Sequence, residues 1–120
     1  MGTKIILARH GETLWNRESR FQGSKDIKIT DEGRKQAQKL AKRFENEKID
    51  AVYASDLSRA YQTAELVAQE HSLIVEQVSG LREIHFGNWE GMMYEEIEQE
   101  SDFTFTEWLE DPVNRTAPEG

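Results

Sequence analysis

The chain has 120 residues, 37% hydrophobic and 32% charged, which suits one globular domain with a modest core and excludes a disordered tail. Its formal net charge of −8 argues against a nucleic-acid partner, because that binding rests largely on Lys and Arg side chains that neutralise phosphates. Cysteine is absent and no apolar run reaches the roughly 20 residues of a membrane span, so we expect a cytoplasmic, soluble protein without disulfides, thiolate chemistry or a membrane partner.

The first predicted element is a buried strand over residues 4–8, which leads directly into Arg9 and His10. Residues 9–26 are predicted to form a long loop rich in Gly, Asn, Ser and charge, and loops of this length are usually functional or disordered. The carboxyl end of a strand is where α/β enzymes place their chemistry. A lone histidine at such an end is nevertheless more often an ordinary surface residue than a nucleophile.

Strand–helix units are predicted to follow this loop. Thr30 is a candidate N-cap for a helix that reaches about residue 47, and residues 49–54 and 57–69 are expected to form a second strand and helix. Residues 72–78 add a third strand. The β-α-β-α-β order predicts a three-layer α/β fold in which a mostly parallel sheet lies between helices.

Apolar residues at helical spacing are interpreted as core. They are Ala37, Leu40, Ala41 and Phe44 on the first long helix, and Leu57, Ala60, Ala64, Val67 and Ala68 on the second. Residues 81–91 are predicted to be irregular, and residues 95–100 and 104–110 to form short helices that turn Trp108 and Leu109 inward. Residues 111–120 are predicted to be a loop.

Side chains that could take part in catalysis or binding follow all three predicted strands. They are Arg9, His10, Ser55, Arg59, Arg82 and Glu83. Arginine matches the geometry of phosphate oxygens, a neutral imidazole can attack phosphorus, and a carboxylic acid can protonate the departing oxygen. Taken singly, Arg59 fits a solvated helix and Glu83 a surface ion pair, so only their shared place at strand ends favours a site. The three histidines are far apart in the sequence and form no metal-binding pair, so we expect no metal.

Four ordered groups of motifs resemble the histidine phosphatase superfamily, the phosphoglycerate mutase-like enzymes. The first is RHGET at residues 9–13, with WN at 15–16 and RFQG at 20–23; the second is ITDEG at 29–33 with QA at 36–37; the third is YASDLSRA at 53–60 with QTA at 62–64; the fourth is LREI at 81–84 with FGNWEG at 86–91. Together they cover about residues 4–95, and the combination is highly specific.

The resemblance implies a role for each matching residue. His10 would attack phosphorus and become the phosphohistidine, Arg9 and Arg59 would clamp the phosphoryl oxygens, and Glu83 would be the general acid. The positions implied in substrate or phosphate binding are Arg9, Gly11, Glu12, Thr13, Asn16, Gln22, Gly23 and Arg59. The partner implied is a small phosphorylated substrate, and neither a metal nor an organic cofactor is implied.

Residues 81–91 resemble the phosphatase branch typified by α-ribazole phosphatase and broad-specificity phosphomonoesterases. The glycolytic mutases carry a basic, proline-rich segment after the corresponding glutamate, whereas residues 95–108 are acidic here, which disfavours a bisphosphorylated ligand. We therefore expect an α-ribazole phosphatase-like phosphomonoester hydrolase, with mutase-type phosphoryl transfer as the alternative.

One family feature is missing from this sequence. Members of the family carry a second histidine in a Ser/Thr-His-Gly-like turn, and this chain has no such motif; its last residues, APEG at 117–120, resemble the family's Pro-x-Gly-Glu-Ser loop cut short. We therefore expect residues 1–120 to be the amino-terminal portion of an incomplete domain that lacks the carboxyl-terminal strands, either a truncated gene product or an incomplete chain. Such a chain is expected to have impaired activity and to form a homodimer or a strand-swapped oligomer, and a non-catalytic relic or interaction domain is a further alternative.

Overall fold

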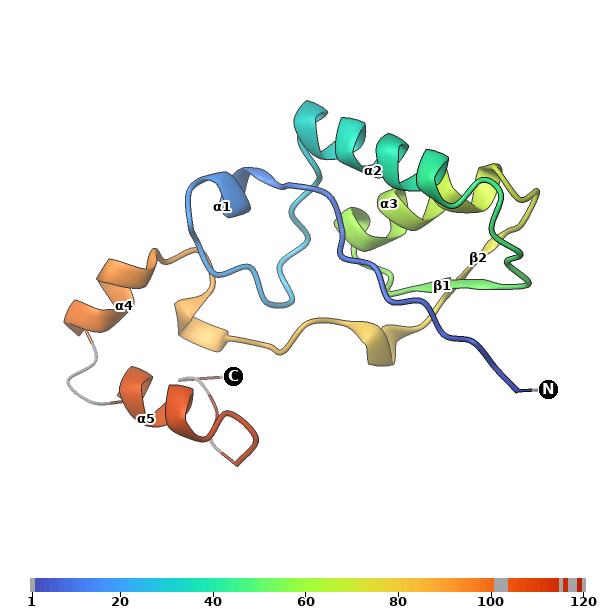
Figure 1. The fold of residues 1–120 in the computed structure, drawn as a ribbon. Helices are drawn as coiled ribbons and strands as arrows, with labels where there is room; N and C mark the ends of the chain where they lie inside the picture. The colour runs from blue at the N-terminus through green and yellow to red at the C-terminus, as the bar shows by residue number, and fades with distance from the viewer. Residues whose placement is uncertain (1, 101–103, 115, 117–118, 120) are drawn as a thin grey trace.

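The computed structural model describes residues 2–100, 104–114, 116 and 119. Its centre is a strand–helix–strand unit made of β1 (Val52–Ala54), α3 (Ser58–Gln69) and β2 (Val75–Gln77). The two strands pair in parallel, with Val52 opposite Val75 and Ala54 opposite Gln77. Helix α3 packs on both strands, and α2 (Asp31–Arg43) packs on α3 (Figure 1). The predicted order of these four elements is confirmed.

Local chemistry explains where the two long helices lie. The Thr30 hydroxyl caps α2 by accepting a hydrogen bond from the Gly33 N–H at 3.0 Å, and Ala37 and Ala41 face the interior as predicted. Helix α2 ends at Arg43 rather than near residue 47, because the chain goes on in turns. A small core forms where Ala68 of α3 meets the two strands.

The predicted first strand is wrong. Residues 4–8 form no strand, and their side chains are exposed, with Ile5 77% and Leu7 91% accessible. Figure 1 shows this segment as an unpaired trace leading from the amino terminus toward α1. A strand requires a hydrogen-bonded neighbour, and in the described part of the chain β1 and β2 pair only with each other. Apolar sequence alone therefore did not suffice to make a strand here.

A second core gathers the carboxyl-terminal elements. The aromatic turn η2 (Gly87–Trp89) and helices α4 (Tyr94–Glu100) and α5 (Thr104–Glu110) surround the buried side chains of Trp89 and Ile97. Trp108 packs edge-on against Trp89, with ring centroids 5.7 Å apart, so its predicted inward position is confirmed. Leu109 was predicted wrongly, because the next residue of a helix points about 100° away and its side chain is half exposed. None of the described helices is long and apolar enough to span a membrane.

Two short elements begin outside the predicted helices and strands. Helix α1 (Leu14–Arg17) occupies the predicted loop after His10, and the turn η1 (Ser79–Leu81) follows β2. The predicted terminal loop from residue 111 lies partly outside the described residues.

Candidate active site

A cleft of about 460 Å³ lies where the first loop, the start of α3 and the segment after η1 meet. The residues that line it are Arg9, His10, Asn16, Arg20, Phe21, Gln22, Gly23, Arg59, Glu83 and Phe86. All four predicted catalytic residues are in this set, although they come from segments far apart in the sequence.

His10 is half buried and held by one short hydrogen bond. Its Nδ1 atom lies 2.6 Å from the carbonyl oxygen of Gly11, and since a carbonyl only accepts, Nδ1 carries the proton. The Nε2 atom therefore keeps its lone pair. Burial is the largest influence on the pKa of His10 and lowers it; the hydrogen bond to Gly11 is the next largest and raises it, and the positive charges of Arg59 and Arg9 lower it further against a small raising effect from Glu83. The imidazole is thus biased toward its neutral, nucleophilic form.

Arg59 is only 3% exposed and its guanidinium is held by main-chain carbonyls. Nη1 donates to the Lys25 oxygen and Nη2 to the Gly23 oxygen, each at 2.6 Å. Burial lowers the pKa of Arg59, with Glu83 the largest opposing influence, yet an arginine stays protonated in proteins. The first turn of α3 therefore places a fixed positive charge beside the cleft.

Thr63 links α3 to the loop that carries His10. Its hydroxyl donates to the carbonyl oxygen of Arg59 at 2.8 Å and accepts the N–H of Gly11 at 2.9 Å. A single buried side chain thus connects the backbone of the cleft arginine with the residue after the histidine. Thr63 lies in the third motif group, but the sequence alone predicts no role for it.

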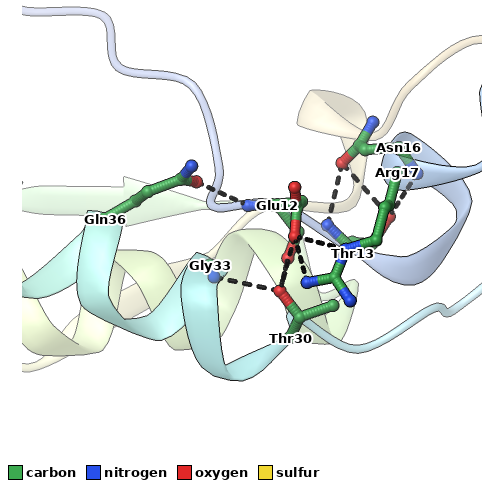
Figure 2. Close-up of polar contacts among 7 residues, drawn as sticks. All are labelled: Glu12, Thr13, Asn16, Arg17, Thr30, Gly33 and Gln36. Carbon is green, nitrogen blue, oxygen red and sulfur yellow. Dashed lines mark hydrogen bonds and ion pairs between the residues drawn. The ribbon is translucent and has the colours of Figure 1, made fainter.

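Glu12 faces helix α2 and is not among the residues that line the cleft (Figure 2). Its carboxylate accepts hydrogen bonds from Thr30 Oγ1 at 2.9 Å and Arg17 Nη2 at 2.7 Å, and its N–H donates to Gln36 Oε1 at 2.9 Å. The bonds from Arg17 and then Thr30 lower the pKa of Glu12. Its contacts therefore fix the loop to the start of α2.

Thr13 is fully buried and begins α1. Its hydroxyl accepts the Asn16 N–H at 3.1 Å while Asn16 Oδ1 accepts the Thr13 N–H at 3.0 Å, which forms a capping box (Figure 2). The same hydroxyl donates to Gln22 Oε1. Thr13 thus lies outside the cleft lining but holds Asn16 and Gln22, two residues that belong to it.

Two glycines allow the His10 loop to touch α2 backbone to backbone. A Cβ atom on Gly11 would lie 2.3 Å from the Gly33 carbonyl oxygen, and one on Gly33 would lie 2.2 Å from the Glu12 oxygen. Gly11 therefore serves packing in the structure, and it does not line the cleft. Gly23 does line it, in a left-handed conformation with φ of 55°, and a Cβ there would lie 2.7 Å from Glu90 Oε1.

Three residues that line the cleft, Arg20, Phe21 and Phe86, belong to the motifs, but the sequence predicted no role for them. Arg20 Nη1 donates to the Gly91 carbonyl oxygen at 2.7 Å, and the rings of Phe21 and Phe86 meet edge-on with centroids 5.0 Å apart. These contacts join the first motif group to the fourth. The contacting residues are about 70 positions apart in the chain, so local sequence patterns could not predict these contacts.

Glu90 lies next to the cleft without lining it, and its side chain is only 1% exposed. Its Oε1 accepts the N–H of Ser24 at 3.2 Å and the N–H of Phe86 at 3.1 Å. His85 Nε2 lies 3.4 Å from the same oxygen and does not line the cleft. Among the described residues, no three His, Cys, Asp or Glu side chains gather as a metal site would require.

The fold is of the α/β class, and its cleft brings a histidine with a lowered pKa together with three arginines, Arg9, Arg20 and Arg59. A model of the histidine phosphatase superfamily (branch 1) matches residues 5–120, and the chain belongs to that superfamily. The family predicted from the motifs is therefore confirmed.

Relatives of known name include both phosphatases and mutase-like proteins. The chain is 45% identical over 95 residues to phosphoglycerate mutase-like protein 4 of Arabidopsis thaliana, covering 78% of this chain and 41% of the relative. It is 38% identical over 109 residues to phosphoserine phosphatase 1 of Hydrogenobacter thermophilus, covering 91% and 52%. The chain thus spans about half the length of the curated relatives it matches.

Solved structures confirm the α/β fold of this family. A mycobacterial glucosyl-3-phosphoglycerate phosphatase matches with a TM-score of 0.84 at 33% identity, over 89% of this chain and 51% of that one. The α-ribazole phosphatase of Shigella flexneri matches with a TM-score of 0.81 at 32% identity, over 92% and 55%. The chain is therefore a member of an enzyme family whose named relatives act on different phosphate esters.

Proposed function

We propose that this chain carries the nucleophilic part of a phosphomonoester hydrolase that works through a phosphohistidine. The observation that carries the proposal is the setting of His10: the residue lines the cleft, its Nδ1–H is bound to the Gly11 oxygen, and burial lowers its pKa, which favours the neutral ring with an unprotonated Nε2. A neutral imidazole with one free nitrogen is a competent nucleophile toward phosphorus.

In the first step, His10 Nε2 attacks phosphorus and the bond from phosphorus to the ester oxygen breaks. Glu83, in its protonated form, gives its proton to the departing oxygen, so an alcohol leaves. The phosphorylated ring keeps its Nδ1 proton, and its positive charge is stabilised by the bond to the Gly11 oxygen. Arg9 and Arg59 stabilise the charge on the phosphoryl oxygens.

In the second step, the Glu83 carboxylate takes a proton from water and the resulting hydroxide attacks phosphorus. The bond between phosphorus and Nε2 breaks, inorganic phosphate leaves, and neutral His10 is restored. Glu83 is again protonated for the next cycle, so the proposed mechanism uses no metal and no organic cofactor.

The remaining predicted site residues divide into two groups under this proposal. Asn16, Gln22 and Gly23 line the cleft and are proposed to contact the substrate. Gly11, Glu12 and Thr13 are proposed to position the loop, because their bonds and close contacts run to α2, α3 and the cleft wall.

We propose a small phosphomonoester as the substrate, of the kind used by α-ribazole or broad-specificity phosphatases. A mutase binds a second anionic group, which requires further positive charge. Here Arg20 is already engaged by two carboxylates, Glu18 Oε1 at 2.8 Å and Glu96 Oε1 at 3.5 Å. The charge left for a second phosphate is small, which favours hydrolysis over mutase-type transfer.

We further propose that residues 1–120 form the amino-terminal portion of a histidine phosphatase domain, as the motif order suggests. The non-catalytic alternative is favoured by one observation, the unpaired and exposed segment at residues 4–8 that leads into Arg9 and His10. Cytoplasmic location stays a prediction.

The deciding experiment compares the chain with its His10→Ala variant on p-nitrophenyl phosphate. We expect hydrolysis by the wild type and a loss of about 100-fold or more in the variant, because removal of a nucleophile leaves only binding contributions. Brief incubation with substrate and an alkaline quench is expected to trap acid-labile phosphate on the wild type alone. Equal rates in the two proteins would refute the nucleophile, and two rates at the uncatalysed background would favour the non-catalytic domain.

A further inference from the structure

We propose that Asp56 and Arg82 form a positioning pair that holds Glu83 in the cleft. Arg82 Nε donates to Asp56 Oδ1 at 2.6 Å and Arg82 Nη2 donates to Asp56 Oδ2, so the pair is bidentate. Arg82 directly precedes Glu83 in the chain. The inference rests on the proposed function, because it is the proton transfer by Glu83 that makes its position matter.

The segment that carries Glu83 has little else to hold it. Within residues 79–84 every side chain is exposed, and the main-chain hydrogen bonds of Leu81 and Arg82 reach back only to Val78 and Ser79. The Glu83 carboxylate accepts the N–H of its own neighbour Ile84 at 2.8 Å. Among the described hydrogen bonds, those between Arg82 and Asp56 are the ones that tie this segment to the strand–helix unit.

Asp56 is a firm anchor because it lies in the turn between β1 and α3. Its neighbours Ser55 and Leu57 are buried, and Arg59 follows three residues later at the start of the helix. The bond to Arg82 lowers the pKa of Asp56, so the carboxylate stays charged well below neutral pH. One turn of chain thus sets the place of the cleft arginine and, through Arg82, the place of the general acid.

The pair is exposed, with side-chain accessibilities of 45% for Arg82 and 32% for Asp56. Exposed ion pairs contribute little to folding stability, so loss of this pair is expected to leave the chain folded. A bidentate arginine–carboxylate pair does fix direction, because two parallel bonds define the plane of both groups. Orientation of Glu83 is therefore the property that the pair supplies.

Two substrates with different leaving groups can distinguish a misplaced Glu83 from a general loss of activity. An alkoxide leaves only if it receives a proton, so hydrolysis of an alkyl phosphate depends on Glu83. The p-nitrophenolate anion is stable at neutral pH and leaves without a proton. A misplaced Glu83 is thus expected to slow the first reaction and spare the second.

The test uses the double variant Asp56→Asn/Arg82→Gln, which removes the ion pair and keeps the net charge. We expect kcat on glycerol 2-phosphate to fall about tenfold or more, which is part of the contribution of a positioned general acid. The rate on p-nitrophenyl phosphate is expected to change less than about twofold, and KM to stay unchanged on both substrates. The exchanged pair Asp56→Arg/Arg82→Asp is expected to restore much of the lost rate.

A matched control removes another exposed pair, Lys4 and Glu47, whose charged atoms lie 2.6 Å apart and whose residues do not line the cleft. The variant Lys4→Gln/Glu47→Gln is expected to leave both rates unchanged. Equal losses on the two substrates, or no loss, in the Asp56 and Arg82 double variant would overturn the positioning role.

The wild type and His10→Ala decide the proposed function separately in the same assay. If neither substrate is hydrolysed above the His10→Ala background, the proposed function fails and amide exchange decides the positioning alone. The Ile84 N–H, which donates to Glu83, is then expected to exchange faster with solvent in the double variant. Unchanged exchange at Ile84 would overturn the inference.

Discussion

At the scale of single residues, the main feature of the cleft is the way its side chains act on the protonation state of His10. His10 faces two cationic side chains, Arg9 and Arg59, and one carboxylate, Glu83, and burial is the largest influence on its pKa. Because the charged form of the ring is the one disfavoured, the neutral imidazole is present over a wider pH range than for an exposed histidine.

We predict that the His10 pKa measured by NMR titration lies below the ordinary value of 6.5 and rises toward it in Arg9→Gln. Loss of a nearby positive charge makes protonation easier, so the direction of the change follows from the charge alone. The exposed Arg43 at the end of α2 supplies the control, and Arg43→Gln is expected to leave the titration unchanged. A titration midpoint at or above 6.5 in the wild type would contradict the prediction.

The same shift links folding to pH. Below 6.5 the unfolded chain takes up a proton on His10 before the folded chain does, because the folded pKa is lowered. The free energy of unfolding therefore falls as the pH is lowered from 6.5 through the pKa of His10 in the folded chain. Above 6.5 both states hold a neutral ring and His10 contributes nothing to the pH dependence.

At the scale of elements, the loop that carries His10 is fixed by the helix that follows it, α2. Thr30 caps α2 and also donates its N–H to the Glu12 oxygen at 2.8 Å, so the start of the helix and the loop share one residue. Gln36, six residues further along the chain in α2, accepts the Glu12 N–H. These bonds are local to α2, yet they determine where His10 lies.

We predict that Gly33→Ala destabilises the chain by about 1–3 kcal/mol in urea unfolding, as overpacking commonly does. Alanine gains about 1 kcal/mol over glycine within a helix, but its Cβ would lie 2.2 Å from the Glu12 oxygen, which is main chain and cannot rotate away. Lys39→Ala on the exposed face of α2 serves as the control and is expected to be neutral. A Gly33→Ala variant as stable as the wild type would show that the loop yields at little cost.

Sequence patterns predicted these elements where their causes are local. The Thr30 cap and the buried Ala37 and Ala41 follow from short-range signals and were predicted correctly. The parallel pair of β1 and β2 was also predicted correctly, from the alternation of strand, helix and strand. Helix α1 was missed because Asn16 takes the place of the usual Glu or Gln in its capping box. Residues 4–8 carry the apolar run of a strand, but no described neighbour pairs with them, and pairing is not a local property.

In the candidate site, too, some features could be predicted from local sequence and others depend on distant partners. His10, Arg59 and Glu83 were predicted to share one site because each follows a predicted strand. All three line one cleft, although the segment before His10 forms no strand. Motif membership could not distinguish side chains that face the cleft from side chains that hold it, so Glu12 and Thr13 were grouped with Asn16. That distinction depends on partners many positions away along the chain.

At the scale of the whole molecule, the exposed apolar segment at residues 4–8 sets the expected association behaviour. Ile5 and Leu7 are largely accessible, as is Ile74 next to β2, and both strands of the described sheet have an open edge. Apolar side chains beside unpaired strand edges favour pairing between chains.

We predict that the chain is a dimer or a larger oligomer in size-exclusion chromatography with light scattering. Leu7→Lys is expected to shift it toward monomer, because Leu7 is 91% exposed and the substitution removes apolar surface without disturbing a core. Val113→Lys, at a position 90% exposed near the other end of the chain, is the control and is expected to leave the mass unchanged. A stable wild-type monomer would rule out this mode of association.

The contact between Gly11 and Gly33 bears on how such a cleft adapts to new substrates. The two backbones already touch without side chains between them, so no exchange of residues can bring the loop nearer to α2. The distance between the His10 loop and α2 is therefore fixed by the two backbones. Changes in substrate preference are therefore expected at other lining residues, such as Arg20, Phe21 and Phe86, which can vary in size and charge while His10 keeps its place.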